Sequence, residues 1–484
     1  MISFNKVYNE DCLVFMKTLP DNYIDSIVTD PPYGLSSQPD IIEVMTCWMD
    51  NKPFAHSAKG FMGKEWDSFV PGPEYWKECF RILKPGGHIA AFGGSRTYDL
   101  ISIGLRFANF EIRDTLHWLY SSGFPKSHNI SVSVDKKMGN QPKIVGQKPA
   151  GMGTGDSFGM RQTDGTNDTD NGLAPLYEVI SEEAKYWDGW GTALKPAYEP
   201  IILARKPLDS GLSVADNVLK WGTGGLNIKK SRVGNDIRFH ASAKSSPGTF
   251  IDSPINDYGG HTVEGRWPAN ILNENTEELK SIYSTFGETK SATKSHPRAG
   301  GKNGMFLVDG GGAPTQAYAD DGSPFRMFNS FEHDDESTQM RLFHCGKATI
   351  ADRDDGLETF LDKKKAGEYC ISSHNGINRM DTSQQRKNIH PTVKPTSLMR
   401  WLCTLITPVN GLIYDPFSGS GSTGKGAILS GFKFIGTEME SEYCDIANAR
   451  LQYAIDNRDA ILNNGGNPLI KNNRPVKMAN NKFF

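Results

Sequence analysis

The four residues Asp30-Pro31-Pro32-Tyr33 are the first group in the chain whose chemistry suits a ligand. They follow an apolar stretch that predicts a strand, and α/β sheets bind ligands at the carboxyl ends of their strands. Neither proline has an N–H, so this backbone offers carbonyl acceptors, which together with the Asp30 carboxylate suit an NH2 group. The Tyr33 ring can stack on a flat partner. The alternative is a buried Asp-Pro turn, because Pro-Pro is common in turns.

Gly419, Gly421 and Gly424 form a second such group, with GxGxxG spacing between a predicted strand and a predicted helix. In that context glycines let backbone amides approach a ligand, and an adenosine-type molecule is expected. Asp415, at the end of the preceding strand, also favours a ligand at this loop. Glu438 ends the next predicted strand, where a carboxylate can accept hydrogen bonds from ribose hydroxyls.

Three different interpretations of this glycine-rich loop remain open. Residues 419–425 also fit a GxxxxGK phosphate loop, but Gly426 stands where a magnesium-binding Ser or Thr is needed. A dinucleotide domain would need further strands, which only the amino-terminal half could supply. The third interpretation is a turn that binds nothing.

Alternating strand and helix patterns predict an α/β fold whose sheet is assembled from both ends of the chain. A helix is expected over 74–83, ended by Lys84-Pro85-Gly86-Gly87. The predicted strands are 24–28, 88–92, 111–120, 201–204, 411–414 and 432–436, and the later helices are 396–406, 422–430 and 441–453.

The composition limits the class of protein. The chain has 53 basic and 56 acidic residues, so any nucleic-acid surface must be a local patch. Seven scattered cysteines and an amino terminus without a leader pattern predict a cytoplasmic protein, and apolar runs long enough for a membrane span are missing. His344, Cys345, Cys370 and His374 suggest zinc, but adjacent His-Cys suits tetrahedral ligation poorly, and no metal is expected.

With 484 residues, the chain is long enough for a core with insertions. We expect one half of the core at 1–120, a flexible insertion at 121–195, a core strand within 196–208 and the second half at 389–456. The irregular, Gly/Ser/Pro-rich stretch 209–388 is expected to be a target-recognition insertion. The Asn-rich tail 457–484, with a few basic residues, is expected to be disordered.

Taken together, the motifs resemble the permuted beta group of S-adenosylmethionine-dependent DNA amino-methyltransferases, the adenine-N6 and cytosine-N4 enzymes. In that group the Asp-Pro-Pro-Tyr motif precedes the cofactor loop. Stretches in the middle of the chain are similar to phage and prophage members. Besides the two groups above, the matching segments are Tyr8 to Cys12, Arg81 to Gly87, His390 to Pro395 and Phe434 to Glu438.

The resemblance implies a role for each matching residue. Asp30 and Pro31 would orient the amine of an extruded base, beside Pro32 and Tyr33, for direct attack on the methyl group. The residues implied to hold the cofactor are Asp11 and Cys12 at its adenine, Glu438 at its ribose, His390, Thr392 and Lys394 at its methionine end, and Asp415, Phe417, Gly419, Gly421 and Thr423 around its body.

The substrate implied by the resemblance is double-stranded DNA. We call Asp30-Pro31-Pro32-Tyr33 the clamp. The Asp at its first position resembles adenine enzymes, so adenine-N6 is expected, with cytosine-N4 as the alternative. An RNA or protein-amide methyltransferase and an inactive DNA-binding scaffold also remain open. A cognate restriction endonuclease is a candidate partner, and the resemblance is compatible with a monomer or a dimer.

Overall fold

The computed structural model describes most of the chain, in two units that are treated separately. One unit comprises Met1–Trp118 and Pro200–Phe484, and the other is Leu119–Glu199. The described residues are 2–35, 37–56, 65–120, 127–141, 143–149, 173–194, 196–240, 261–274, 289–290, 321–322, 329–331, 348–360 and 387–463.

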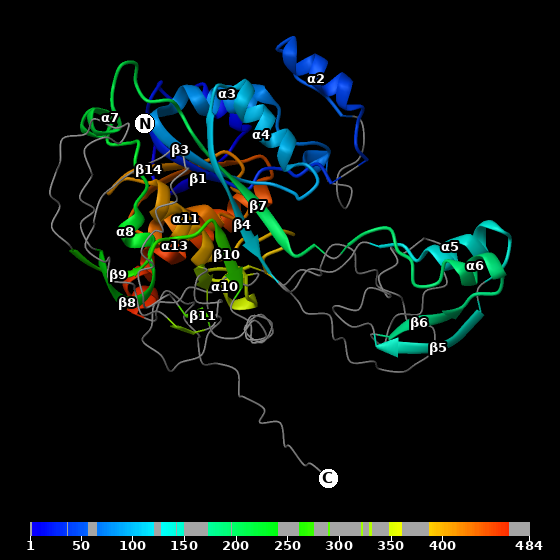
Figure 1. The fold of residues 1–484 in the computed structure, drawn as a ribbon. Helices are drawn as coiled ribbons and strands as arrows, with labels where there is room; N and C mark the ends of the chain where they lie inside the picture. Colours follow the sequence, from blue (N-terminus) through cyan, green and yellow to red (C-terminus); the bar gives the residue numbers. More distant parts are fainter. Residues whose placement is uncertain are drawn as a thin grey trace, which may run out of the picture. The chain divides into compact units, whose positions relative to one another are not determined.

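Apolar segments at both ends of the chain form one sheet in the larger unit (Figure 1). Within the described residues its strand order is β1-β15-β14-β2-β3-β7-β4-β10-β13. The central strands are β1 (Lys6–Asn9), β15 (Lys433–Glu438), β14 (Leu412–Asp415), β2 (Ile24–Thr29) and β3 (Leu83–Phe92). Each is parallel to its neighbour. The carboxyl-terminal strands therefore lie between amino-terminal ones, which confirms the predicted α/β fold assembled from both ends.

Antiparallel pairing begins at β7 (Tyr198–Arg205), which pairs with β3 and separates it from β4 (Glu111–Leu119). Beyond β4 lie β10 (Ile271–Glu274) and β13 (Asn329–Phe331). Part of the stretch 209–388 thus extends the main sheet. Its predicted role in target recognition stays a prediction.

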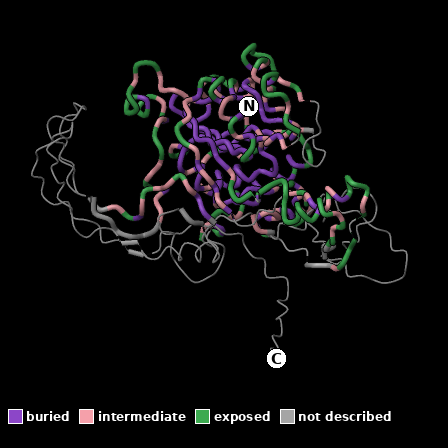
Figure 2. Tube along the Cα trace, turned by 45° about the vertical axis from the view of Figure 1, so that its right-hand side comes forward, coloured by how far each residue is buried: buried purple, intermediate pink, exposed green. Residues whose placement is uncertain are grey.

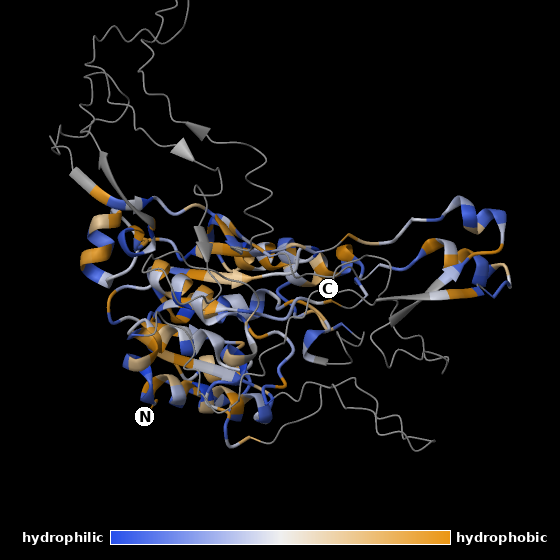
Figure 3. Ribbon diagram, turned by 90° about the horizontal axis from the view of Figure 1, so that it is seen from below, coloured by the Kyte–Doolittle hydropathy of each residue, from blue (hydrophilic) through white to orange (hydrophobic). Residues whose placement is uncertain are grey.

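Helices cover both faces of the sheet, with α3 and α4 on one side and α11 and α13 on the other (Figure 1). All of β2 is buried, as expected for a central parallel strand covered on both faces. Figure 2 shows this buried interior, and Figure 3 shows helices that carry apolar and polar residues together. The covering helices are α1 (Cys12–Met16), α3 (Pro73–Ile82), α4 (Tyr98–Phe107), α11 (Thr396–Ile406), α12 (Ser422–Leu429) and α13 (Ser441–Asp456).

The smaller elements of this unit lie around the core. They are α2 (Ile41–Met49), η2 (Glu65–Asp67), α7 (Val214–Trp221), α8 (Ile228–Ser231), α10 (Ile350–Asp354), α14 (Arg458–Asn463), and the two-stranded pairs β8 (Val233–His240) with β9 (His261–Arg266) and β11 (Thr289–Lys290) with β12 (Asp321–Gly322). The unit Leu119–Glu199 contains α5 (Ile130–Lys137), β5 (Lys143–Pro149), β6 (Leu173–Glu178) and α6 (Glu182–Tyr186).

The end of α3 differs from the sequence prediction. Leu83 does not end the helix but begins β3, and the Pro-Gly-Gly run lies inside that strand at an irregularity in its pairing with β2. Asn217 of α7 supports this run by donating to the Pro85 carbonyl at 2.9 Å. The proline and glycines therefore bend a strand instead of separating two elements.

The start of the predicted tail is also ordered differently from the expectation. Arg458–Asn463 forms the short helix α14, because Ile461 is buried at 1% exposure and anchors it. The remainder of the predicted tail, and the polar stretch 151–172, lie outside the described residues. Among the helices that the structure describes, none is long and apolar enough to cross a membrane.

Candidate active site at the carboxyl edge of the sheet

Four neighbouring parallel strands carry an acidic residue at or just after their carboxyl ends. Asp11 follows β1, Glu438 ends β15, Asp415 ends β14 and Asp30 follows β2. Carboxyl ends of parallel strands lie at one edge of a sheet, so the fold gathers these acids there. The order of the strands also changes direction between β14 and β2, and α/β sheets bind ligands at such a switch point.

A direct hydrogen bond joins the two predicted motifs. The Thr29 hydroxyl donates to Asp415 Oδ1 at 2.6 Å, although the two residues are 386 positions apart. The same carboxylate oxygen accepts from the Phe417 N–H at 3.1 Å. Burial raises the pKa of Asp415 to about 6, against the opposing effect of hydrogen bonds from Thr29 and Thr423. The strand end that precedes the clamp and the turn that leads into residues 419–424, which we call the glycine loop, are therefore joined by one buried carboxyl group, that of Asp415.

The Asp30 carboxylate is held on both of its oxygens. Tyr33 donates its hydroxyl to Oδ1 at 2.8 Å, and Lys394 donates its ammonium to Oδ2 at 2.6 Å. The side chains of Lys394 and Asp30 are 6% and 16% exposed. The rings of Tyr33 and Phe92 lie 5.3 and 5.0 Å from the Lys394 ammonium. The structure thus pairs Lys394 with the clamp, a contact that the motifs do not predict.

Asp67 and Thr97 support the clamp, and sequence reasoning misses both. Asp67 is buried and accepts hydrogen bonds on Oδ1 from the N–H groups of Tyr33 and Gly34 at 2.9 and 3.1 Å. Thr97 donates its hydroxyl to the Tyr33 carbonyl at 2.6 Å. Neither residue belongs to a motif, and each lies more than 30 positions from the clamp, so the sequence alone offers no signal for them.

Glycine is required at the bends of the glycine loop. Gly419 and Gly421 have φ angles of +50° and +77°, which side-chain-bearing residues rarely adopt. A Cβ at Gly419 would lie 2.7 Å from His390 Nε2, and one at Gly424 would lie 2.6 Å from the Phe434 ring. Gly421 is the N-cap of α12 and offers no side chain, so first-turn N–H groups of α12 are left for other partners.

Glu438 fastens this loop to β15. Its Oε2 accepts the Gly419 N–H at 2.9 Å, and its Oε1 accepts the Glu440 N–H at 2.9 Å. Burial raises the pKa of Glu438, and the two hydrogen bonds lower it. The effect of burial is larger, so the pKa is about 7. The carboxyl group expected at a ribose is therefore rigidly placed next to the glycine bend.

Lys425 does not act as a phosphate-loop lysine. Its ammonium is buried and donates to Asp352 Oδ1 at 2.7 Å and to Asp355 Oδ2 at 2.8 Å. A phosphate-binding lysine must point its charge toward the loop, and this one is paired with two carboxylates from α10 and the residue after it. The nucleoside-triphosphate interpretation is accordingly not supported.

Asp11 and Cys12 open α1 at the same edge. Asp11 is the N-cap and accepts on Oδ1 from the N–H groups of Leu13 and Val14 at 2.8 and 3.1 Å. Cys12 is buried in the main apolar core, and burial raises the pKa of its thiol far above the ordinary value. A thiol of this kind is a packing group and not a nucleophile.

The segment before α11 meets the loop through His390. Its ring stacks on Trp66 with centroids 6.4 Å apart and meets the edge of Tyr443 at 4.7 Å. Thr392, by contrast, is exposed. Phe417, on the loop, is half-buried, and its ring centroid lies 5.9 Å from that of Tyr75.

Metal-binding geometry is not found in the described ranges, where no group of three or more His, Cys, Asp or Glu side chains could hold an ion. The residues considered for zinc, His344, Cys345, Cys370 and His374, lie outside the described residues.

A family model described as DNA methylase, the N6/N4 group, matches residues 24–449. Among curated proteins, the chain is 24% identical over 239 residues to the type II methyltransferase M.HindIII of Haemophilus influenzae, covering 46% of this chain and 64% of that protein. It is 44% identical over 63 residues to the orphan methyltransferase M.BamHII of Bacillus amyloliquefaciens, covering 13% of this chain and 24% of that protein. The chain thus covers less than two thirds of the length of these relatives.

A solved structure is also distantly similar to the chain. The cytosine-N4-specific PvuII DNA methyltransferase matches with 12% identity and a TM-score of 0.38, covering 96% of this chain and 94% of that one.

Proposed function

Because the chain belongs to the N6/N4 DNA methylase family, we propose that it transfers a methyl group from S-adenosylmethionine to the exocyclic amine of a base in duplex DNA. The observation that supports this proposal is the hydrogen bond from Thr29, the residue before the clamp, to Asp415, which precedes the glycine loop. An amine acceptor and a nucleotide-type cradle at one sheet edge are what this transfer requires.

The residues present fit the cofactor. Two glycine bends with positive φ turn the backbone of the loop, and the missing Cβ at Gly419 lets that backbone lie directly against the His390 ring. Glu438 offers a half-buried carboxyl group for ribose hydroxyls, and the start of α12, which has no side-chain cap, offers N–H donors. We assign the cofactor's contacts to Asp11, Cys12, His390, Thr392, Lys394, Asp415, Phe417, Gly419, Gly421, Thr423 and Glu438.

When bound, S-adenosylmethionine supplies a methyl group on a positively charged sulfur, which leaves as a thioether. The chain's own residues position the acceptor. Asp30 and the Pro31 carbonyl accept the two hydrogens of the amine, which turns its lone pair toward the methyl group. A carboxylate offers about four lone-pair positions, so Asp30 can keep Tyr33 and Lys394 while it accepts the amine. Its negative charge also stabilises the positive charge that develops on the amine nitrogen, which becomes neutral again when one of its two protons is released to water after the N–CH3 bond has formed.

The base must leave the duplex to reach this edge, and we assign its stacking partner to Tyr33. The hydroxyl contact with Asp30 fixes the direction of that ring, and Pro32 stiffens the backbone between the two residues. Stacking of a base on an aromatic ring contributes about 1–3 kcal/mol, which offsets part of the unstacking cost.

For the target base we propose adenine, on the resemblance of Asp30 to the first clamp residue of adenine enzymes. Both adenine and cytosine carry an exocyclic amine, so the carboxylate itself does not discriminate between them. The order of the motifs, clamp before loop, supports assignment to the permuted beta group. A restriction endonuclease is a proposed partner, by analogy with type II relatives.

The test is transfer of labelled methyl from S-adenosylmethionine to unmethylated duplex DNA, followed by digestion and mass spectrometry of the nucleosides. Wild type should place the methyl on the adenine amine, and Asp30→Ala should abolish transfer while cofactor binding persists. Asp209→Ala is a matched control, because it removes a carboxylate from another 2.6 Å lysine pair, away from this edge.

Each different product would change a different part of the proposal. Methyl on the cytosine amine would keep the mechanism and replace the base. Methyl on a ring carbon would refute direct attack by an amine. Cofactor binding without DNA product would favour RNA, a protein amide or a scaffold role.

A further inference from the structure

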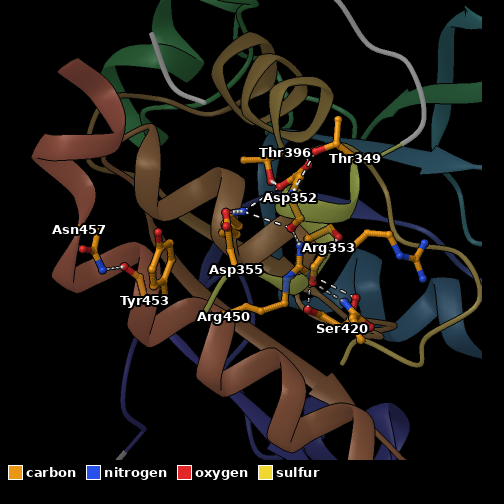
Figure 4. Close-up of polar contacts among 12 residues, drawn as sticks. Thr349, Asp352, Arg353, Asp355, Thr396, Ser420, Arg450, Tyr453 and Asn457 are labelled. Atoms are coloured by element: carbon orange, nitrogen blue, oxygen red, sulfur yellow. Dashed lines mark hydrogen bonds and ion pairs between the residues drawn. The ribbon is translucent and has the colours of Figure 1, made fainter. Parts of the chain in front are cut away.

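A buried cluster of charges lies behind the glycine loop, and neither motif predicts it (Figure 4). We call Asp352, Asp355, Lys425 and Arg450 the α10 ion cluster. All four are less than 9% exposed. Lys425 bonds both carboxylates, and Arg450 Nη2 donates to the Asp352 carbonyl at 3.0 Å. Burying charge is costly unless every charge is paired, so a cluster of this kind needs all its members.

Asp352 is the ionised centre of the cluster. Burial would raise the pKa of its carboxyl group, but Lys425 and Arg450 outweigh that effect and lower it to about 2. Asp355 differs, since burial raises its pKa despite Lys425.

The carboxylate of Asp352 accepts hydrogen bonds from Thr396, two residues after Lys394. Its Oδ2 accepts the Thr396 N–H at 2.9 Å, and its Oδ1 accepts the Thr396 hydroxyl at 2.5 Å. Thr396 begins α11, whose N-cap Pro395 has no side-chain donor or acceptor of its own. Asp352 therefore anchors the first turn of α11, two residues after the lysine that holds Asp30.

The backbone carbonyl of Asp352, and not its carboxylate, is linked to the glycine loop through Arg450. While Nη2 of Arg450 bonds the Asp352 carbonyl, its Nη1 donates to the Ser420 carbonyl at 2.5 Å and to Ser420 Oγ at 3.1 Å. Ser420 lies between the two bent glycines. The arginine thus links α10 directly to the backbone of the loop.

Further hydrogen bonds connect α10 to the segment before α11. Arg353 donates to the His390 carbonyl at 2.6 Å, and Asn388 donates its side chain to the Arg353 carbonyl at 3.0 Å and its N–H to Asp354 Oδ1 at 3.1 Å. Helix α10 belongs to the stretch 209–388, outside the motifs of the core. A segment from that stretch therefore bonds two of the parts of the chain that we assign to the cofactor, the His390–Lys394 segment and the glycine loop.

We propose that Asp352 is a positioning residue, whose carboxylate joins Thr396, next to the His390–Lys394 segment, to Lys425 of α12, the helix that the glycine loop opens, and so sets the affinity for S-adenosylmethionine. This inference rests on the proposed function. The Asp352 carboxylate acts through Thr396 and Lys425, and Asp352 is not among the residues that we assign to the cofactor's contacts.

The test compares Asp352→Asn with Asp355→Asn. Both remove one carboxylate from Lys425, but Thr396 donates to Asp352, so the pair separates positioning from the loss of a buried charge. Cofactor affinity is measured by calorimetric titration of full-length protein with S-adenosylmethionine, alongside the melting temperature and DNA affinity without cofactor. We expect Asp352→Asn to weaken cofactor binding about tenfold, within the usual range of coupling between sites, and Asp355→Asn to change it less than about twofold.

A milder pair covers the case in which Asp352→Asn does not fold. Thr396→Val removes the hydroxyl donor and Thr396→Ser restores it, so cofactor affinity should fall about fivefold in the first and return in the second. Equal affinity in Asp352→Asn and Asp355→Asn, or in Thr396→Val and Thr396→Ser, would overturn the inference. If wild type itself binds no S-adenosylmethionine, the proposed function fails instead, so the two failures are distinct.

Discussion

Replacing Lys394 with methionine tests which group the lysine serves. In the structure its ammonium lies 2.6 Å from Asp30 Oδ2, and the two side chains are 6% and 16% exposed. Methionine keeps the length and the apolar stem of the side chain and removes the charge. Asp30 then retains the Tyr33 hydroxyl but loses its cationic partner.

The expected loss of stability is about 3 kcal/mol. At 2.6 Å the gross attraction between unit charges is about 6 kcal/mol at an effective dielectric constant near 20. Breaking a buried pair by removing one partner typically costs about 3–5 kcal/mol, and the partial exposure of Asp30 places this pair at the low end. For a unit of about 400 residues that loss lowers the melting temperature by about 3–4 °C.

The assay is scanning calorimetry of Lys394→Met beside a matched control, Lys220→Met. Lys220 also lies 2.6 Å from a carboxylate, that of Asp209, but their side chains are 57% and 28% exposed. An exposed pair contributes about 0–1 kcal/mol, so the control should melt within about 2 °C of wild type. Equal losses in the two variants would refute the reasoning from burial.

Cofactor titration of the same variant separates two roles for the lysine. If Lys394 mainly positions Asp30, methyl transfer should fall by about 100-fold, as when one electrostatic group is removed from an active site, while cofactor affinity changes little. A large loss of S-adenosylmethionine affinity without a loss of stability would instead assign Lys394 to the cofactor, as the family resemblance implies.

Three further outcomes are expected. Gly419→Ala should destabilise the protein by about 1–2 kcal/mol and weaken cofactor binding, because φ is +50° and the new Cβ would lie 2.7 Å from His390 Nε2; melting and titration measure both. Since the pKa of Glu438 is raised from 4.5 to about 7, the folded state keeps a proton that the unfolded state releases, and this group should lower the free energy of unfolding by about 3 kcal/mol as pH rises from about 4.5 to 7. Denaturant titrations of Glu438→Gln should lose the fall between about pH 6 and 7, whereas a fall below about pH 6 remains because the pKa of Asp415 is also raised, to about 6. Thr29→Val removes a 2.6 Å hydrogen bond to Asp415 and should cost about 1.5–3 kcal/mol in chemical denaturation, whereas Thr29→Ser should stay near wild type.

The carboxyl-terminal strands and helices could be predicted to within a few residues because their signals are local. Apolar strands end at Asp415 and Glu438, and glycines stand where the chain bends between them. Helix α3 was predictable from its apolar face, but its end was not, because the Pro-Gly-Gly run after it is accommodated inside β3 with help from Asn217.

The supports of the site could not be predicted, for a different reason. Asp67 and Asp352 act through contacts 34 and 44 positions away, and their own surroundings carry no motif. Lys425 illustrates the same limit, since its spacing fits a phosphate loop and only the fold reveals that two carboxylates already bind it. Local patterns predict elements and ligand-facing bends, whereas long-range polar partners appear only when the chain is folded.

The place of β14 beside β2 also has a consequence for how the protein is made. β2 has two neighbours in the sheet, β3 and β14. The ribosome makes β3 soon after β2, but β14 follows only after several hundred more residues, since Thr29 and Asp415 are 386 positions apart. At about 5–20 residues per second, that delay is roughly 20 to 80 s. During this time the nascent chain carries its amine clamp beside an unpaired strand edge, which is prone to wrong pairing. The glycine loop therefore reaches the clamp only after this delay, and a chaperone that covers the waiting β2 edge should raise the yield of correctly paired protein.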